Sequence, residues 1–232
     1  ALVYGYIYAS QKKLSKIGIQ MTYVTPEPET INKFLEEYTF ERIEEWFNKL
    51  ITGFKRWTDY TFDERHKRTE SIRELKFPYE YREGQKNLCV SVYRAIEDNT
   101  NLYIQAPTGV GKTLSTVFPA VQALGQQMSD KIFYLTSKTI TRTVAEDTYA
   151  ILRDNGLHMR TVTLTAKDKI CPLDERNCNP VACPYAKGHF DRINDAVYDI
   201  ITSQMVIGRD NVMEYANRHN VCPFEMSLDV SY

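Results

Sequence analysis

The sequence lacks the features that mark membrane and secreted proteins. Its longest uncharged run, residues 113–129, contains one proline and three glutamines, so it is too short and too polar to span a bilayer. No charged segment followed by an apolar one opens the chain, so we expect no secretory signal. The net charge of −1 provides no basic field to attract nucleic acid. We expect a cytoplasmic protein with no membrane partner, whose nucleic-acid contacts are local.

Composition excludes several further classes. Hydrophobic residues make up 43% and charged residues 25% of the 232 residues, which rules out a disordered tail, a collagen-like chain and a disulfide mini-protein. The five cysteines are an odd number, which argues against a disulfide framework. The sequence shows no internal repeat. Because it starts at Ala1 and stops at Tyr232, we expect a piece of a longer protein.

Residues 1–76 are rich in aromatic and charged side chains. Their pattern predicts a helix at the start and a strand over residues 17–24. From Phe40 the apolar residues recur on one stripe at helical spacing, which predicts a long amphipathic helix reaching into the fifties or sixties. We interpret this helix as a packing element.

Residues 77–166 alternate between helical and strand patterns. Helices are predicted over residues 84–97, from residue 112 and over residues 141–153. Strands are predicted over residues 101–105, 131–135 and 160–164. Strands separated by helices predict an α/β domain with a parallel sheet and helical crossovers.

The segment Ala106-Pro-Thr-Gly-Val-Gly-Lys-Thr113 lies between a predicted strand and a predicted helix. Gly109 and Gly111 permit backbone angles that turn amide groups inward, and the helix start adds further donors for phosphate. Lys112 would reach the β- and γ-phosphates, and Thr113 would hold Mg²⁺. The expected ATP-binding residues of this P-loop are Thr108, Gly109, Val110, Gly111, Lys112 and Thr113.

An aromatic segment with a glutamine precedes the P-loop. Gln85 lies 27 residues before Lys112, and its amide can pair with the N6 and N7 edge of adenine. Phe77, Tyr79 or Tyr81 would stack on the base, and we favour Phe77 and Tyr81. The alternative is an ordinary aromatic loop before a helix.

An acidic strand end that would hold Mg²⁺ and orient water is missing. Asp-Glu pairs occur at residues 63–64 and 174–175, but neither follows a buried apolar run. We therefore expect this Walker B strand beyond Tyr232. The chain itself should bind nucleotide without hydrolysing it efficiently.

Four cysteines lie in residues 167–223, a segment with few apolar runs, so we expect bound metal to stabilise it in place of a core of its own. Thiolates suit a tetrahedral zinc or an iron–sulfur cluster, and spacing alone leaves both open. Proline follows three of the four, a common feature of iron–sulfur sites. We expect His189 on a surface turn rather than as a ligand. The expected metal ligands are Cys171, Cys178, Cys183 and Cys222.

The combination of P-loop and cysteines resembles the XPD and DinG family of superfamily 2 DNA helicases. Residues 77–85 look like that family's Q motif, residues 135–139 like its motif Ia, and residues 164–171 like the segment leading into its first cluster cysteine. Cys222-Pro223-Phe224 resembles its Cys-Pro-Tyr, with phenylalanine in place of the usual tyrosine. The first three cysteines are also unusually close together, which implies a compact cluster domain.

The resemblance implies a RecA-like P-loop domain with an inserted iron–sulfur domain. The shifts in composition at residues 76, 166 and 223 give the boundaries, and the resemblance makes residues 77–166 the motor, 167–223 a 4Fe–4S domain held by the four cysteines, and 224–232 the return into the motor. It also implies ATP hydrolysis coupled to 5′-to-3′ movement along single-stranded DNA. Cys89 matches no ligand, and we interpret it as a buried apolar residue.

Residues 1–9 look like the helix that follows the active site in RecB-type PD-(D/E)XK nucleases, with Tyr4 as the tyrosine of a Gln-x-x-x-Tyr motif. This resemblance would make residues 1–76 the end of a nuclease-like domain plus a linking helix. The alternative is an unrelated helix and strand that pack on the motor.

Residues 131–170 hold seven Lys or Arg and four Asp or Glu, a local positive excess that favours contact with single-stranded DNA phosphates. A monomer is expected. Two other readings remain: a zinc-stabilised nucleotide-binding regulatory module without helicase activity, and a P-loop kinase, which the cysteine segment does not support. The expected DNA-binding residues are Thr136, Ser137, Lys138 and Lys167.

Overall fold

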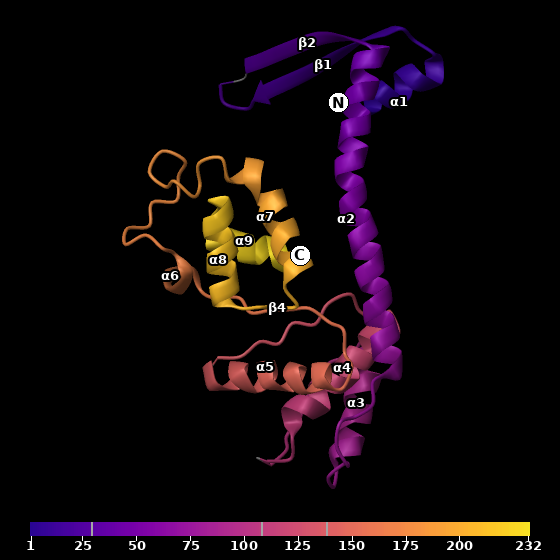
Figure 1. Ribbon diagram of the computed structural model, residues 1–232, viewed down its shortest axis with the longest axis vertical. Helices are drawn as coiled ribbons and strands as arrows, with labels where there is room; N and C mark the ends of the chain where they lie inside the picture. Colours follow the sequence, from indigo (N-terminus) through magenta and orange to yellow (C-terminus); the bar gives the residue numbers. More distant parts are fainter. Residues whose placement is uncertain (29, 108, 138) are drawn as a thin grey trace. The chain divides into compact units, whose positions relative to one another are not determined.

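The computed structural model describes residues 1–28, 30–107, 109–137 and 139–232, without the side chains of Thr139 and Ile140. The chain divides into two compact units, Ala1–Asp63 and Glu64–Tyr232 (Figure 1). This division falls inside one helix, ahead of the predicted boundary at residues 76 and 77. The functional boundaries at 76, 166 and 223 stay predictions. Among the described residues, no helix has the length and apolar character needed to cross a membrane.

The first unit is a helix packed beside a β-hairpin. Helix α1 covers Leu2–Lys12, strands β1 and β2 cover Lys16–Thr25 and Thr30–Thr39, and α2 begins at Phe40. The strands are antiparallel, from the pair Lys16 and Thr39 to the pair Thr25 and Thr30. The predicted first helix, first strand and helix start at Phe40 are confirmed, whereas β2 was not predicted.

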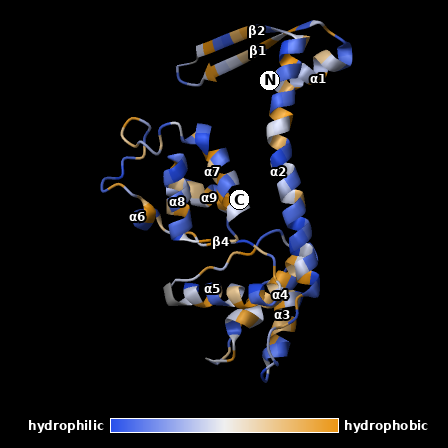
Figure 2. Cartoon of the chain, in the orientation of Figure 1, coloured by the Kyte–Doolittle hydropathy of each residue, from blue (hydrophilic) through white to orange (hydrophobic). Residues whose placement is uncertain are grey.

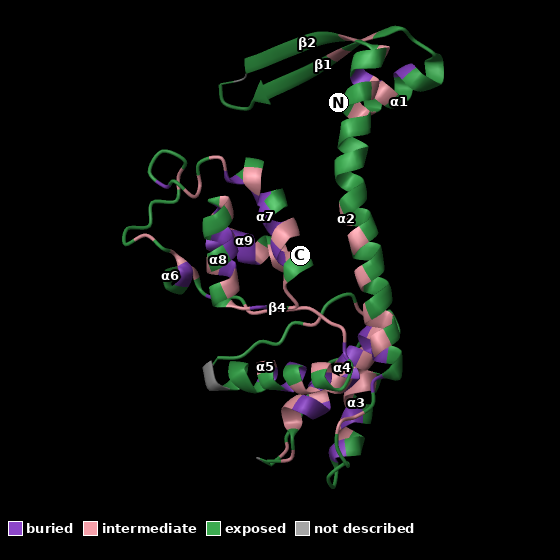
Figure 3. Ribbon diagram, in the orientation of Figure 1, coloured by how far each residue is buried: buried purple, intermediate pink, exposed green. Residues whose placement is uncertain are grey.

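The core of this unit lies at the base of the hairpin. Gly5 lies so close to Ile19 and Ile43 that any side chain there would collide with them. The ring of Tyr6 stacks on Phe47 at 4.0 Å. Farther out, the side chains of both strands are exposed (Figure 3), as expected for a two-stranded ribbon whose faces have no covering layer within the unit.

The second unit begins with the end of α2, which spans Phe40–Glu74 and so extends further than predicted. Helices α3 (Gln85–Glu97), α4 (Lys112–Gly125) and α5 (Thr139–Asp154) follow, close to the predicted ranges. Val121 and Leu152 are fully buried among them, in a core that includes Ile72 of α2. Hydrophobic residues gather around α3 and α4 (Figure 2).

Two of the three strands predicted for this unit are absent from the described residues. Residues 101–105 and 131–135 have no strand pairing, and the observed parallel sheet consists of β3 (Thr161–Val162) and β4 (Val206–Ile207). The physical reason is pairing: a strand needs a hydrogen-bonded neighbour, and Tyr103 and Leu135 are 93% and 88% exposed. The two segments retain the apolar composition of strands, but within the described part of the chain no neighbour pairs with them.

The cysteine-bearing part contradicts our expectation that it lacks a core. Helices α7 (His189–Ser203), α8 (Arg209–His219) and α9 (Pro223–Ser231) pack together, after the short helix α6 (Lys167–Ile170). Their buried side chains recur at helical spacing instead of forming a continuous apolar run. The sequence pattern therefore did not predict the core that they form. The fully buried members include Ala196, Ile200, Val212, Ala216 and Met226.

Within the second unit, Glu64 connects the end of α2 to the chain that follows α5. Its carboxylate accepts hydrogen bonds from His158 Nε2 at 3.0 Å and Lys67 Nζ at 3.2 Å, and lies 3.6 Å from the guanidinium of Arg160. Burial alone would raise the pKa of Glu64, but the hydrogen bonds from His158 and Lys67 outweigh it and lower the pKa. A lowered folded-state pKa stabilises the fold above the unfolded-state pKa, and this contribution is lost as pH falls through the folded-state value.

We expect Glu64→Gln to lower the free energy of unfolding by about 1 kcal/mol at pH 7 and to flatten its decline below about pH 4.5. Urea denaturation at several pH values measures both. Glu70→Gln on the same helix is the control, since Glu70 pairs with His66 on the exposed surface. An equal loss of stability at every pH would contradict the assignment.

Candidate functional site

The P-loop turns into α4 through two glycines with positive φ angles. Gly109 has φ 85° and Gly111 has φ 74°, a left-handed conformation that other residues rarely adopt. Gly111 is the residue immediately before α4, so the amides at the start of α4 follow the loop directly. Val110 lies half-buried between the two glycines. Thr108, predicted to belong to the loop, lies outside the described residues.

Lys112 is the first residue of α4 and folds back over its own loop. Its Nζ donates hydrogen bonds to the carbonyl oxygens of Ala106 at 3.0 Å and Pro107 at 2.6 Å. The ammonium group thus reaches across the mouth of the loop, where the predicted phosphates would lie. A phosphate would compete with these carbonyls for the same charge, and a charge-assisted bond to an anion is the stronger of the two.

The glutamine segment packs directly against the P-loop. Gln85 is buried, and its Oε1 accepts a hydrogen bond from the Arg82 amide at 3.0 Å. The Arg82 guanidinium in turn donates to the Gly109 carbonyl. Gln85 and the P-loop are therefore brought together as predicted. Arg82, three residues before Gln85, was missed because no sequence signal marks it as the arginine that reaches this carbonyl.

Gly111 has no room for a side chain. A Cβ atom there would lie 2.7 Å from Gln85 Nε2, and φ is positive. We expect Gly111→Ala to weaken ATP binding about tenfold or more, because the strained turn would displace Gln85 and the amides before α4. Calorimetric titration with ATP and Mg²⁺ measures this. Gly53→Ala is the control, since nothing lies within 4 Å of that position; equal affinities would contradict the packing of Gln85 on the loop.

One pocket collects most of the predicted nucleotide residues. It is lined by Gln85, Gly109, Gly111, Lys112 and Thr113, together with Tyr79, Arg82 and side chains of α5 that include Thr148. Phe77 and Tyr81 do not line it. Their rings stack on each other at 4.2 Å, and Phe77 also meets Phe118 edge-on. Stacking of Phe77 and Tyr81 on adenine stays a prediction. Tyr79 is the aromatic residue that lines the pocket.

The predicted DNA-binding residues fall into two places. Thr136 and Ser137 are exposed just before α5, and Lys138 lies outside the described residues. Lys167 begins α6, where its Nζ lies 3.4 Å from the Glu225 carboxylate and 5.2 Å from the centre of the Phe224 ring. Burial would lower the pKa of Lys167, but hydrogen bonds to Cys178 and Glu225 outweigh it and raise the pKa.

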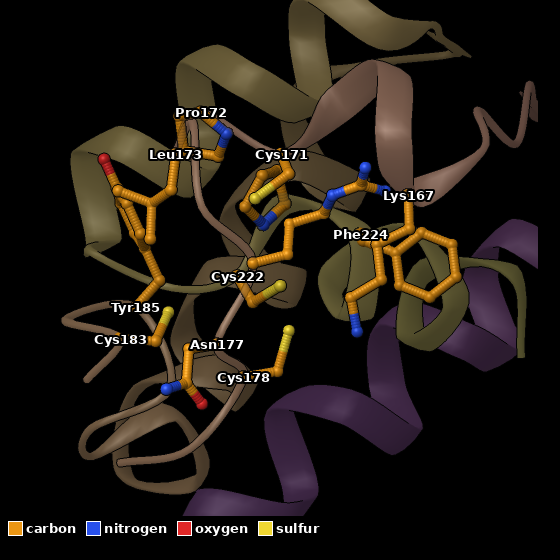
Figure 4. Close-up of a pocket in the computed structure, with 12 residues that line it drawn as sticks. Lys167, Cys171, Pro172, Leu173, Asn177, Cys178, Cys183, Tyr185, Cys222 and Phe224 are labelled. Carbon is orange, nitrogen blue, oxygen red and sulfur yellow. The ribbon is translucent and has the colours of Figure 1, made fainter. Parts of the chain in front are cut away.

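The four predicted metal ligands line a single pocket in the second unit (Figure 4). Cys171 follows α6, Cys178 and Cys183 lie in the irregular loop before α7, and Cys222 immediately precedes α9. Cys178 is exposed and Cys183 is buried. Burial raises the pKa of the Cys222 thiol. Lys167, Tyr185 and Phe224 are among the other residues that line it.

The donor set suits a thiolate-bound metal or cluster in number and chemistry. Within the described part of the chain, no three or more His, Cys, Asp or Glu side chains stand close enough together to hold one metal ion. Cys89 lies apart, buried in α3, and burial raises its pKa. This agrees with its interpretation as an apolar core residue.

His189 is not on the surface, which corrects our prediction. It is the first residue of α7 and is 6% exposed. Its Nδ1 accepts a hydrogen bond from the Cys222 amide at 3.3 Å. The turn after Gly188 directs the imidazole inward, against α9, while the neighbouring Phe190 is 87% exposed. Burial lowers the pKa of His189.

Comparison with known proteins gives two matches. Residues 83–177 match the DEAD/DEAH box helicase family, a range that includes the P-loop and Cys171. A 47-residue stretch, 20% of the chain, is 49% identical to a probable ATP-dependent helicase of Methanocaldococcus jannaschii and spans 7% of that relative's length. No solved structure matches. Residues 83–177 are thus similar to the DEAD/DEAH box helicases, a family whose domain implies the use of ATP and Mg²⁺, and the match to the Methanocaldococcus jannaschii protein agrees with a relationship to helicases.

Proposed function

We propose that the chain is part of an ATP-dependent DNA helicase of the XPD and DinG type, with a 4Fe–4S cluster next to its P-loop domain. The observation that carries this proposal is the pair of pockets in one compact unit. One holds the P-loop with Gln85, and the other is lined by all four clustered cysteines. The helicase-family match over residues 83–177 includes Gln85 and the P-loop of the first pocket, and it reaches Lys167 and Cys171 of the second.

In this proposal the chain's own residues position ATP. Lys112 exchanges its two loop carbonyls for the β- and γ-phosphates, and Thr113 holds Mg²⁺. Gln85 lies against Gly111, where its side-chain amide can form hydrogen bonds with the N6 and N7 edge of adenine. The acidic residue that completes hydrolysis would come from the rest of the protein. Coupling to 5′-to-3′ movement along single-stranded DNA rests on family resemblance alone.

The cluster would be bound by Cys171, Cys178, Cys183 and Cys222. A single zinc requires four sulfur atoms about 2.3 Å from one ion, whereas a four-iron cluster is a larger body bound through four cysteines and accepts a wider ring of sulfur atoms. When bound, the cluster would supply covalent links between the loop of residues 171–187 and α9. These links would fix the surroundings of Lys167, one of the residues through which DNA phosphates would be held.

The deciding experiment is metal analysis and visible spectroscopy on protein purified without oxygen. Absorption near ~400 nm with about four irons per chain is the expected result. One zinc per chain in a colourless sample would instead support the zinc-stabilised regulatory module. A parallel titration with ADP should show an affinity that falls on Gln85→Ala, and an unchanged affinity would remove Gln85 from the adenine site.

A further inference from the structure

Cys222 differs from the other three clustered cysteines in the backbone that carries it. Cys171, Cys178 and Cys183 lie along residues 171–187, which form turns and irregular backbone. Cys222 immediately precedes α9, and its carbonyl accepts the first helical bond, from the Met226 amide at 2.9 Å. Figure 4 shows its side chain among those of the other three. The residues that hold Cys222 in place therefore determine the position of one of the four cysteines in the pocket.

Arg192, from the first turn of α7, clamps the chain just ahead of Cys222. Its Nη2 donates to the carbonyl of Asn220 at 2.7 Å and to that of Lys187 at 2.6 Å, and its Nε donates to the carbonyl of His219 at 3.1 Å. Asn220 ends α8 in a left-handed conformation. One guanidinium thus ties the end of α8 to the end of the cysteine loop.

Gly188 makes room for this clamp. It precedes α7 with φ 67°, and a Cβ atom there would lie 2.6 Å from Arg192 Nη1. Both the angle and the space require glycine. The sequence of Gly188, His189 and Arg192 therefore places two polar side chains on the same turn, each directed at residues 219–222.

His189 completes the link by bonding to Cys222 itself. Because the Cys222 amide donates to Nδ1, that nitrogen carries no proton and the ring proton lies on Nε2. Nε2 is 3.9 Å from the Asp229 carboxylate on α9. The imidazole is thus held between the amide that begins α9 and a carboxylate two turns along it.

We propose that His189 and Arg192 are positioning residues for Cys222: they hold this cysteine in place before metal binds, so that the loop of residues 171–187 closes on a fixed partner. The proposal rests on the cysteine site described under the proposed function. A ligand fixed in advance loses less conformational freedom on binding, and partners of this kind typically change metal retention 10- to 100-fold.

The first test measures how fast iodoacetamide alkylates the Cys222 thiol in the metal-free chain. Trypsin places Cys222 and Cys171 in separate peptides, because residues 219–232 contain only Cys222 and residues 170–176 contain only Cys171, whereas Cys178 and Cys183 share the peptide of residues 177–187. We expect His189→Phe to raise the Cys222 rate about tenfold, as for loss of about 1.4 kcal/mol of local order, and to leave the Cys171 rate within about twofold of its original value.

Two variants separate positioning from packing. In His189→Asn the side-chain oxygen can occupy the place of Nδ1 and accept the hydrogen bond from the Cys222 amide. We therefore expect the alkylation rate of Cys222 to stay near that of the original protein. His66→Phe, on the exposed face of α2, controls for the change of residue type. If His189→Phe raised the rates of all cysteine peptides equally, or if His189→Asn behaved like His189→Phe, the proposal would be overturned.

The second test reconstitutes the chain with ferrous iron and sulfide without oxygen, and follows loss of absorbance after a chelator is added. We expect loss to be about tenfold faster in His189→Phe and in Arg192→Lys, and unchanged in His189→Asn. Equal rates in all variants would refute the positioning role while leaving the cluster intact. A parent chain that takes up no iron would refute the cluster, and the alkylation rates would then report on Cys222 alone.

Discussion

Replacing Lys112 by alanine should lower the affinity for ATP with Mg²⁺ by about 100-fold or more, as for loss of about 3 kcal/mol from a charged group that pairs with phosphate. The ammonium now bonds two carbonyls of its own loop, Ala106 and Pro107. Its removal frees the loop but takes away the charge that offsets the phosphates. Calorimetric titration of the chain measures the binding, which does not require hydrolysis.

Lys86→Ala is a matched control for this substitution. Lys86 is also a lysine in the first turn of a helix, next to Gln85, but it is exposed and absent from the pocket lining. Its loss changes the net charge by the same amount, so we expect an affinity within about twofold of the original. Similar effects of the two substitutions would show that overall charge, not the P-loop, governs ATP binding.

The P-loop turn and the position of Gln85 were predictable from the sequence because their signals are local. Glycine spacing and a lysine at a helix start dictate the turn by themselves, and Gln85 precedes the loop by a distance that one helix and one extended segment span. Arg82 escaped prediction since its role is a contact with the Gly109 carbonyl. Only the folded chain shows which of several arginines reaches that oxygen.

Features that depend on partners far away in the sequence were predicted poorly. The strands expected over residues 101–105 and 131–135 have the right composition, but strand formation is a property of pairs, and no pairing reaches them within the described part of the chain. Conversely, the core of α7, α8 and α9 was missed because its buried residues are dispersed. His189 was assigned to the surface since a glycine before it suggested an exposed turn, yet that glycine directs the ring inward.

Replacing Cys183 by serine should remove most of the metal, with iron falling from about four per chain to below about one. Cys183 is the buried cysteine of the loop, and its amide and carbonyl bond within the turn of residues 179–187. Serine is a poor ligand for iron, and the remaining three thiolates leave the cluster open on one side. Iron and sulfide analysis after anaerobic purification measures the loss.

The structure limits where the damage from this substitution should spread. Because α7, α8 and α9 have a packed core of their own, including the fully buried Ile200 and Val212, they should keep slow amide exchange when the metal is lost. The loop of residues 171–187 has no such core and should exchange faster, by about tenfold or more. Faster exchange throughout α7–α9 would instead show that metal binding holds the three helices together.

Cys89→Ala is the matched control for the loss of iron, because Cys89 is equally buried but lies in α3, away from the pocket. Unaltered iron in Cys183→Ser, or equal iron loss in Cys89→Ala, would refute the set of ligands.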